Sequence, residues 1–223
     1  MKYQRLLFLP LLLLIASCGP VVDNPDPNEN GDQEKINNEI ALIESSKNST
    51  GVIENFTVSQ NNIRYREIYE SKQYDSINNR EHIYYQEKGV SSLDETSPTY
   101  EKSIDVYYDG TYSYTYEEDL VYHRKKEAKT LNYYELPFDV SVMSNITISQ
   151  QNFKTTMNGE ISKESISTFL GYELNTDVIY CTTTTNGSNL TSLKITYTQN
   201  NFDVVREFTY AYLESEIQLP SFI

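Results

Sequence analysis

The chain has 223 residues, of which 38% are hydrophobic, and its 18 basic and 32 acidic residues give a formal net charge of −14 at pH 7. This length allows one folded domain, and 20 tyrosines with only eight glycines and seven prolines exclude a collagen and wholesale disorder. Because nucleic-acid binding requires clustered Lys and Arg, the acidity argues against a nucleic-acid partner.

The N-terminal segment has the pattern of a signal peptide. Lys2 and Arg5 precede an apolar run at residues 6–15, and the run leads directly into Ile-Ala-Ser-Cys at 15–18. Ten apolar residues rise about 15 Å as a helix, roughly half the thickness of the hydrocarbon core, so the run is too short to span a membrane. We therefore predict that residues 1–17 are a signal peptide and take no part in the fold.

Residues 15–18 resemble the lipobox of bacterial lipoproteins. The resemblance implies that the thiol of Cys18 receives diacylglycerol, that the chain is cut before Cys18, and that acyl chains such as palmitate hold the protein outside the cytoplasm on the bacterial cell membrane. Two acyl chains, at about 0.8 kcal/mol per buried CH₂, attach a protein lastingly, whereas one is marginal. The alternative is an ordinary secretory signal that is cut after Ser17 or a little later and leaves the cysteine unmodified.

Residues 18–33, which begin at the lipidation site, are predicted to be a flexible acidic tether. Residues 19–33 contain three prolines, three asparagines, four acidic residues and only two hydrophobic residues, a composition that cannot bury enough surface to fold. Residues 26–31 match the first half of a calcium loop, but the twelfth position, where a Glu closes the coordination shell, is Asn37. We therefore predict a linker here and no metal site.

The domain is predicted to occupy residues 34–223 and to begin with an amphipathic helix over 34–48. Three isoleucines at spacings of four and three form one apolar stripe, a capping residue precedes them, and a glycine follows the helix. The residues are Ile36, Ile40 and Ile43 for the stripe, Asp32 for the N-cap and Gly51 after the end. The hydrophobic period then changes to two, which predicts strands at 52–60, 63–74 and 81–87.

A β-hairpin at residues 104–116 is the most specific local prediction. Asp109-Gly110 separates two alternating runs, and Asp-Gly tolerates the positive φ angles of a type I′ turn. Alternation places the side chains on shared faces of each strand. These are Ile104, Val106 and Tyr108 on the first strand, and Tyr112, Tyr114 and Tyr116 on the second.

A second meander is predicted to close the chain, with strands at 178–185, 191–198 and 202–213 and turns at Asn186-Gly187 and Asn200-Asn201. Leu193, Ile195 and Tyr197 alternate on one strand. On the next strand Val204, Phe208, Tyr210 and Tyr212 alternate, with Arg206 as the one break. One face of this sheet is therefore expected to be buried, and the sheet antiparallel.

Between the meanders, residues 162–170 are predicted to form a short helix. Ser162 suits the N-cap, Gly171 ends the helix, and Ile166, Phe169 and Leu170 are expected to face inward. Residues 136–150 fit neither pattern well. The whole order predicts an α+β domain of many antiparallel strands, with one helix before them and one or two short helices in the middle.

This order of elements resembles the LolA/LolB-like lipoprotein carriers and related Gram-positive or mycobacterial lipid-binding lipoproteins. It covers about residues 34–220, through the Tyr-Asp-Gly-Thr-Tyr-Ser-Tyr hairpin to the closing Ile-Gln-Leu-Pro. The resemblance implies a strongly curved antiparallel sheet, a half-barrel whose concave face holds acyl chains beneath lid helices. By this likeness, the residues that would line the cavity are Tyr108, Tyr112, Tyr114, Tyr116, Leu193, Ile195, Tyr197, Phe208 and Tyr210.

Catalytic and metal-binding patterns are missing from the sequence. His82 and His123 are the only histidines, and neither lies at metal-ligand spacing from a Cys or another His. No nucleophile elbow, zinc-protease motif, phosphate loop or dinucleotide fingerprint occurs. We therefore expect a protein that is not an enzyme and has no cofactor. Because lipidation would use Cys18, Cys181 would have no partner for a disulfide. We expect Cys181 to be a small buried residue, with a reactive thiol as the alternative.

Two functions remain open from the sequence. In the first, the anchored protein binds a lipid or another amphiphile in a cavity of the curved sheet. In the second, it is a surface module with a solid core that binds envelope glycan or a partner protein through exposed tyrosines. The sequence does not decide the ligand, the oligomeric state, or which membrane of a two-membrane envelope would carry the anchor.

Overall fold

The computed structural model describes residues 27–46, 49–90, 98–117, 120–125, 136–213 and 216–221. Side chains are described at 32–46, 49–89, 101–117, 136–213 and 216–221. The predicted signal peptide, Cys18 and most of the predicted tether lie outside these ranges.

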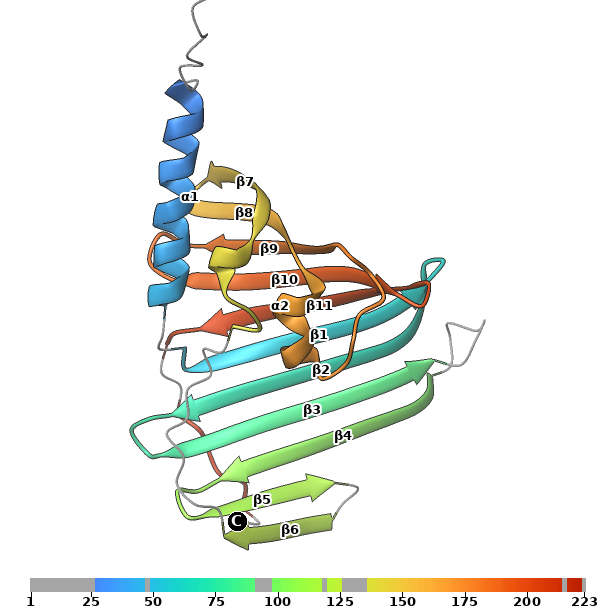
Figure 1. Ribbon diagram of the computed structural model, residues 1–223. Coiled ribbons are helices and arrows are strands. Elements are labelled where there is room, and N and C mark those ends of the chain that lie inside the picture. The colour runs from blue at the N-terminus through green and yellow to red at the C-terminus, as the bar shows by residue number, and fades with distance from the viewer. Residues whose placement is uncertain are drawn as a thin grey trace, which may run out of the picture.

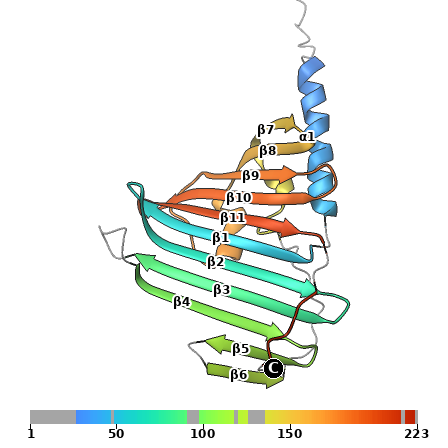
Figure 2. The same ribbon diagram turned by 180° about the vertical axis from the view of Figure 1, so that it is seen from behind.

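The described strands form one curved, unclosed antiparallel sheet in the order β6-β5-β4-β3-β2-β1-β11-β10-β9-β8-β7 (Figures 1 and 2). It consists of two meanders, which pairing of β1 with β11 joins into one sheet. The predicted antiparallel α+β class is confirmed. The strands are β1 (Gly51–Gln60), β2 (Ile63–Asp75), β3 (Arg80–Val90), β4 (Pro98–Tyr108), β5 (Tyr112–Glu117), β6 (Leu120–Lys125), β7 (Ser144–Gln151), β8 (Lys154–Ile161), β9 (Ile179–Thr185), β10 (Leu190–Gln199) and β11 (Phe202–Ala211).

Paired asparagines make several of the tight turns. Asn61 and Asn62 have φ angles of 52° and 65°, and Asn200 and Asn201 have 53° and 66°. Two successive positive φ angles are the mark of a type I′ turn, and Asn adopts them more readily than most residues. The turn predicted at Asn200-Asn201 is therefore confirmed.

The β4–β5 hairpin forms as predicted, but its turn is wider than a two-residue type I′ turn. Only Gly110 of the Asp-Gly pair has a positive φ, of 97°, and the last pair of the ladder is Tyr108 with Ser113. The carboxylate of Asp109 accepts hydrogen bonds from the backbone amides of Thr111 at 2.8 Å and Tyr112 at 2.7 Å. These bonds stabilise the longer loop, because they satisfy amides that the ladder leaves free.

The first helix, α1, runs from Pro27 to Ser45 across the ends of the β7–β10 strands (Figure 1). Ile36 and Ile43 are buried and Ile40 packs against the same cluster, so the predicted apolar stripe is confirmed. The predicted start is wrong, since Asp32 lies within the helix and pairs with Lys35 at 3.0 Å. The helix also includes residues 27–33, which the composition assigned to the tether. Extending a helix costs little free energy once a packed segment has nucleated it.

The second helix, α2, spans Lys163–Leu170 and follows the predicted N-cap, Ser162. Gly171 has a φ of 73° and donates its amide to the carbonyl of Ser167 at 2.9 Å, which ends the helix as predicted. Ile166 and Leu170 are buried, but Phe169 is 38% exposed. The expectation that Phe169 faces inward is therefore met only in part: its ring contacts Phe208 of β11 but stays partly exposed at the edge of the helix.

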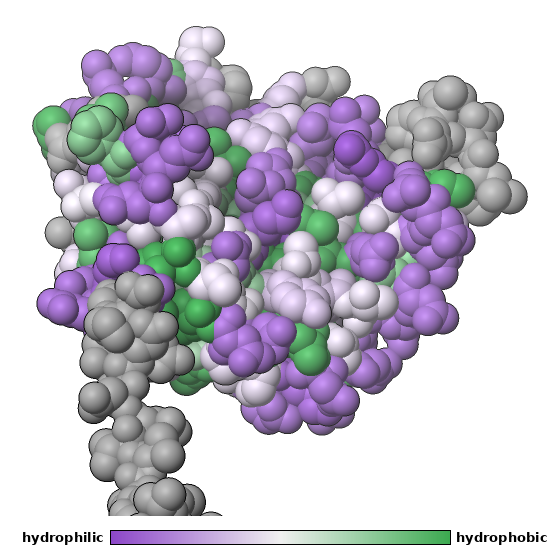
Figure 3. Space-filling view, turned by 90° about the horizontal axis from the view of Figure 1, so that it is seen from above, coloured by the Kyte–Doolittle hydropathy of each residue, from purple (hydrophilic) through white to green (hydrophobic). Residues whose placement is uncertain are grey.

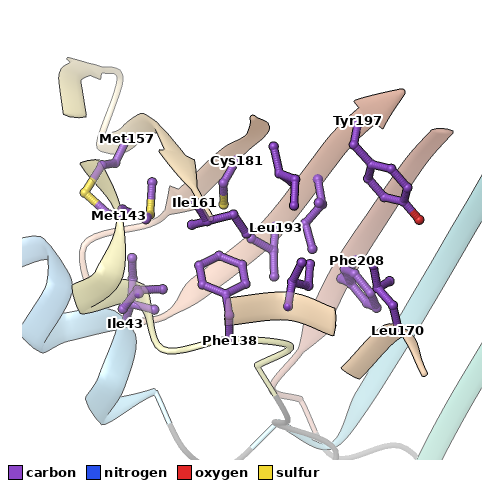
Figure 4. Packing of buried hydrophobic residues seen from close by; sticks show 14 of the residues in the cluster. Ile43, Phe138, Met143, Met157, Ile161, Leu170, Cys181, Leu193, Tyr197 and Phe208 are labelled. Atoms are coloured by element: carbon purple, nitrogen blue, oxygen red, sulfur yellow. The ribbon is translucent and has the colours of Figure 1, made fainter. Parts of the chain in front are cut away.

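One hydrophobic cluster forms the main core (Figure 4). Its members come from α1, α2, the segment around the short 3₁₀ helix η1 (Val140–Val142), and strands β1 and β8–β11. Among the described side chains, no member comes from β3, β4 or β5. The core therefore covers only part of one face of the sheet. Among the described residues, no helix has the length and apolar character required to cross a membrane.

Candidate functional site

The two faces of the sheet are defined by the strand register. Phe56 of β1 pairs with Arg206 of β11 and with Ile68 of β2, and Ile68 pairs with Glu87 of β3. Directly paired residues point to the same side of a sheet. We call the side that bears Phe56 and Phe208 the lidded face, because α2 packs against it, and the opposite side the outer face.

Helix α2 covers part of the lidded face. The ring of Phe169 meets the ring of Phe208 on β11 edge to face, with 6.1 Å between ring centroids. Ile166 and Leu170 extend the same contact into the core. In Figure 1, α1 and α2 lie over the part of the sheet that holds β1 and β7–β11, and none of the described helices lies in front of β3 or β4.

The covered half of the lidded face is filled with protein. Leu193, Ile195, Tyr197, Phe208 and Tyr210, all predicted cavity residues, are buried in one cluster. Figure 4 shows Phe208 next to Leu170 and Leu193 next to Phe138 within this cluster. Protein interiors leave few voids larger than a water molecule. An acyl chain could therefore contact these five side chains only if α2 or the segment around Phe138 moved.

The four predicted tyrosines of the β4–β5 hairpin lie elsewhere. Tyr108 is on the lidded face, since it pairs with Glu81 of β3, and it is 1% exposed. Tyr107 pairs with Tyr114, so the even-numbered residues of β5 point to the outer face. The structure thus separates Tyr112, Tyr114 and Tyr116 from the lidded face, on which α2 packs. The predicted set of nine residues does not form one site.

Beyond the core, β2–β4 present a mixed strip on the lidded face, which we call the open half. Aliphatic and aromatic side chains alternate there with charged ones, and each is half-buried. Tyr85 donates its hydroxyl to Glu87 at 2.6 Å, and burial, together with this bond, raises the pKa of Tyr85 to about 12. The open half consists of Ile68, Glu70, Lys72, Ile83, Tyr85, Glu87, Ile104 and Val106.

Each charged residue of the open half has an ion-pair partner, and the partner of Glu87 is Arg66, which lies beside the strip. Lys72 lies 2.6 Å from Glu70, and Arg66 lies 2.7 Å from Glu87. Partly buried charges require such partners, because removing them from water is costly. The strip therefore offers apolar surface and fixed charges side by side, a combination that suits an amphiphile better than a pure hydrocarbon.

A polar cluster lies where the open half meets α2. Arg206 of β11 approaches Glu54 of β1 at 3.3 Å, and its guanidinium lies 4.8 Å from the Phe56 ring and 5.6 Å from the Phe169 ring. Burial raises the pKa of Glu54, although Arg206 acts in the opposite direction. The sequence showed Arg206 only as a break in the apolar alternation of its strand. Its partners became apparent only from the pairing of β1 with β11.

Several hollows lie outside the main core. One of about 270 Å³ lies on the lidded face between α1 and strands β7 and β8, lined by Glu39, Ile148 and Thr155 among others. Another, of about 200 Å³, lies mainly on the outer face, with Asn55, Tyr69 and Gln86 among its lining residues. Seen from above, the surface shows small hydrophobic areas among hydrophilic ones (Figure 3). No cluster of three or more described His, Cys, Asp or Glu side chains is arranged to hold a metal ion.

His82 and Cys181, the two other residues considered for metal binding or reactivity, have ordinary structural surroundings. Nε2 of His82 lies 2.8 Å from a carboxylate oxygen of Asp105, and its ring stacks on Tyr107 at 4.3 Å. Cys181 is buried, and burial raises the pKa of its thiol to about 12. The prediction of a small buried cysteine is therefore confirmed. The side chain of His123 lies outside the described residues.

Comparison with family models and with curated proteins finds no match for this chain. Among solved structures it is similar to LprF from Mycobacterium bovis, with 11% identity and a TM-score of 0.47, over 86% of this chain and 97% of that one. It is also similar to the lipoprotein LppX from Mycobacterium tuberculosis, with 10% identity and a TM-score of 0.37, over 88% of this chain and 100% of that one. At these scores the likeness says nothing of a ligand or an activity.

Proposed function

We propose that this protein is a membrane-anchored lipoprotein outside the cytoplasm that is not an enzyme and binds an amphiphilic ligand on the lidded face. The observation that carries the proposal is the open half, a strip of half-buried aliphatic, aromatic and ion-paired side chains on β2–β4 beside α2. Apolar surface left in water costs about 25 cal/mol per Å². Contiguous apolar areas on a monomer commonly mark a ligand or a partner.

The geometry favours a ligand that lies along the strip over one enclosed in the core. The five core residues from the predicted cavity set are already packed against protein. Ile83, Ile104 and Val106 instead share one face on neighbouring strands and stay half-buried. An aliphatic chain laid across β3 and β4 would remove these side chains from water. The adjacent charges would meet a polar headgroup.

The ligand is tested by native mass spectrometry of a chain that begins at residue 19, followed by organic extraction of what co-purifies. We expect a bound lipid that leaves only on denaturation. Ile83→Asn should weaken the retention of that lipid, because it places an amide in the open half. Ile53→Asn is the matched control, since Ile53 lies on the outer face of β1. A lipid-free protein with no thermal shift on adding lipids would refute the proposal.

The anchor is a separate part of the proposal and rests on the sequence at 15–18. Metabolic labelling with radioactive palmitate should mark the full-length chain in a bacterial host. Cys18→Ala should abolish the label and release the protein from the membrane fraction, whereas Cys181→Ala should do neither. Membrane association of Cys18→Ala would show that something other than lipid on Cys18 holds the protein.

A second candidate function is binding of envelope glycan on the outer face. The observation that favours it is the hollow of about 200 Å³, where the Tyr69 ring lies among amide and hydroxyl groups of Asn55, Thr57 and Gln86. Sugar rings stack on aromatic faces while amides bond their hydroxyls. Binding of soluble cell-wall polysaccharide that Tyr69→Ala abolishes and Tyr85→Ala preserves would favour this function over lipid binding.

A further inference from the structure

Among the residues of β11 whose side chains point to the lidded face, Arg206 is the only charged one. Its neighbours among them, Val204 and Phe208, are buried in the core, and the Arg206 side chain itself is only 18% exposed. A cation at such a position loses most of its hydration and requires compensation from nearby groups. The partners of Arg206 therefore decide what this position can do.

The rings beside Arg206 compensate part of its charge. Its guanidinium lies 4.8 Å from the centroid of Phe56 and 5.6 Å from that of Phe169. These distances fall within the range of a cation–π interaction. Nε of Arg206 is buried and Phe169 is partly exposed at the edge of α2, so an anion in the open half would reach Nε once the Phe169 ring turns aside.

The hydrogen-bonding capacity of Arg206 is only partly used. Its closest contact with Glu54 is 3.3 Å, whereas charge-assisted N–H···O bonds usually measure about 2.7–2.9 Å. Its Nε group is buried and has no hydrogen-bond partner among the described residues. The Tyr197 hydroxyl also interacts with the guanidinium. A planar guanidinium with a free Nε–H can still donate two parallel hydrogen bonds to a carboxylate or phosphate.

Glu54 is a weakly held partner. Burial disfavours its charged form, and the nearby carboxylate of Glu70 repels it. Glu70 is itself paired with Lys72 at 2.6 Å, so Lys72 does not neutralise Glu54 fully. An incoming anion that accepts hydrogen bonds from Nε and one terminal nitrogen of Arg206 would make shorter bonds than Glu54 does. It would also give the Nε–H group a hydrogen-bond acceptor.

We propose that Arg206 binds the anionic headgroup of the amphiphile, a carboxylate or a phosphate, in place of Glu54, while the aliphatic part lies along the open half. This deepens the proposed function and rests on it. The chain carries a net charge of −14, so its overall field repels anions. A locally under-neutralised arginine is then needed to select an anionic lipid over a neutral one.

The test compares lipids that differ in headgroup charge on the chain that begins at residue 19. The probes are oleate against oleyl alcohol, and dioleoyl phosphatidylglycerol against dioleoylglycerol, with acetate and inorganic phosphate as headgroups alone. We expect each anionic lipid to bind at least about tenfold more tightly than its neutral counterpart, the size of one charge-assisted hydrogen bond. Acetate and phosphate alone should bind far more weakly, because they leave the open half uncovered.

Variants identify the residue that is responsible. Arg206→Gln should remove the preference for anionic lipids and leave the binding of oleyl alcohol unchanged. Glu54→Gln should raise the affinity for oleate several-fold, a gain that misfolding cannot produce. Arg64→Gln makes the same charge change at an exposed position, where the side chain is 68% exposed, and should leave the preference intact.

Each outcome separates the two proposals. Equal binding of charged and neutral lipids, or a preference that survives Arg206→Gln, would overturn the headgroup site and leave lipid binding standing. Failure of every lipid to bind the unaltered chain would overturn the proposed function, and the headgroup site with it. Tight binding of phosphate or acetate alone would show a site for a small anion in place of a lipid.

Discussion

The carboxylate of Asp75, at the end of β2, accepts a hydrogen bond from the backbone amide of Ile217 at 3.2 Å, across 142 residues of chain. The Arg80 guanidinium, on β3, donates to the carbonyl of the same residue at 3.0 Å. The segment after β11 is thereby fixed against the β2–β3 turn, and Figure 2 shows it crossing the ends of these strands. Ile217 is buried there.

Asp75→Ala should destabilise the protein by about 1–3 kcal/mol, because it leaves one buried and three partly buried donors without their acceptor. The donors are the amides of Ile77, Asn78 and Ile217 and the side chain of Asn78. Urea unfolding measures the loss. Asp177→Ala, which removes an exposed carboxylate paired with Lys163, should cost less than about 1 kcal/mol. Equal losses would show that the Asp75 network contributes no special stability.

The contribution of Asp75 should depend on pH. The side-chain hydrogen bond from Asn78, followed by the backbone bonds, holds the pKa of Asp75 below its ordinary value of 3.8. A carboxyl with a lowered pKa in the folded state stabilises the protein above its unfolded pKa, and this stability is lost as the pH falls through the folded pKa. The difference in unfolding free energy between the protein and Asp75→Asn should be constant at pH 5–7 and shrink below about pH 4. A difference that persists unchanged at pH 2 would contradict this.

Ile43→Ala should cost about 2–5 kcal/mol, the usual range for a large aliphatic side chain removed from a core. Ile43 is fully buried against the sheet although it lies on α1, before the first strand. Glu44→Ala, at an exposed position on the same turn, is the control and should change little. Thermal unfolding measures both. A small effect of Ile43→Ala would mean that α1 is not an integral part of the domain.

Cys181 should resist alkylation in the native protein. With a pKa of about 12, only about one thiol in ten thousand is a thiolate at pH 8, and the thiolate is the reactive form. Iodoacetamide should therefore label the chain that begins at residue 19 only after denaturation. Tyr180→Cys, at a position that is 58% exposed, should be labelled in the folded state. Rapid native labelling of Cys181 would revive the alternative of a reactive thiol.

Gly51→Ala should destabilise the junction of β1 with β2. A Cβ at Gly51 would lie 2.9 Å from the carbonyl oxygen of Lys72, a backbone atom that cannot easily move. We expect a loss of about 1–3 kcal/mol. At Gly159 a Cβ would meet the flexible terminal methyl of Met143 at 2.8 Å and also the backbone carbonyl oxygen of Ser144 at 3.0 Å, so Gly159→Ala should cost a similar amount. Urea unfolding of the two variants measures both losses, and an unchanged stability of Gly51→Ala would contradict the prediction.

Local pattern predicted most of the sheet. Alternation located the strands of both meanders, and Asn-Asn and Asp-Gly located turns, because these signals depend on neighbouring residues only. The β7–β8 hairpin was missed, since its turn at Asn152-Phe153 carries no glycine and its strands are rich in Ser, Gln and Thr. The start of α1 was also misplaced, because residues added to a helix that is already packed need no new nucleation, so the helix continues through Asp32 to Pro27.

The predicted cavity residues were chosen by hydrophobicity and alternation alone. Those signals found Leu193, Ile195 and Phe208, which are buried on one face, but they could not show that α2 and the segment around Phe138 fill the space above them. The hairpin tyrosines illustrate a different limit. The register pairs Tyr107 with Tyr114, so Tyr112, Tyr114 and Tyr116 face away from Tyr108, whatever their own hydrophobicity.

The sequence by itself determined the periodicity of the strands, the turn chemistry, the signal pattern at 15–18 and the isolated charge at Arg206, since each is written in adjacent residues. The tertiary structure alone decided which half of the sheet is filled and which partners Arg206 receives. Pairing of β1 with β11 brings Glu54 and Phe56 beside Arg206 from the opposite end of the chain, and packing of α2 adds Phe169. Contacts between such distant segments depend on how the two meanders pair into one sheet, which no local pattern encodes.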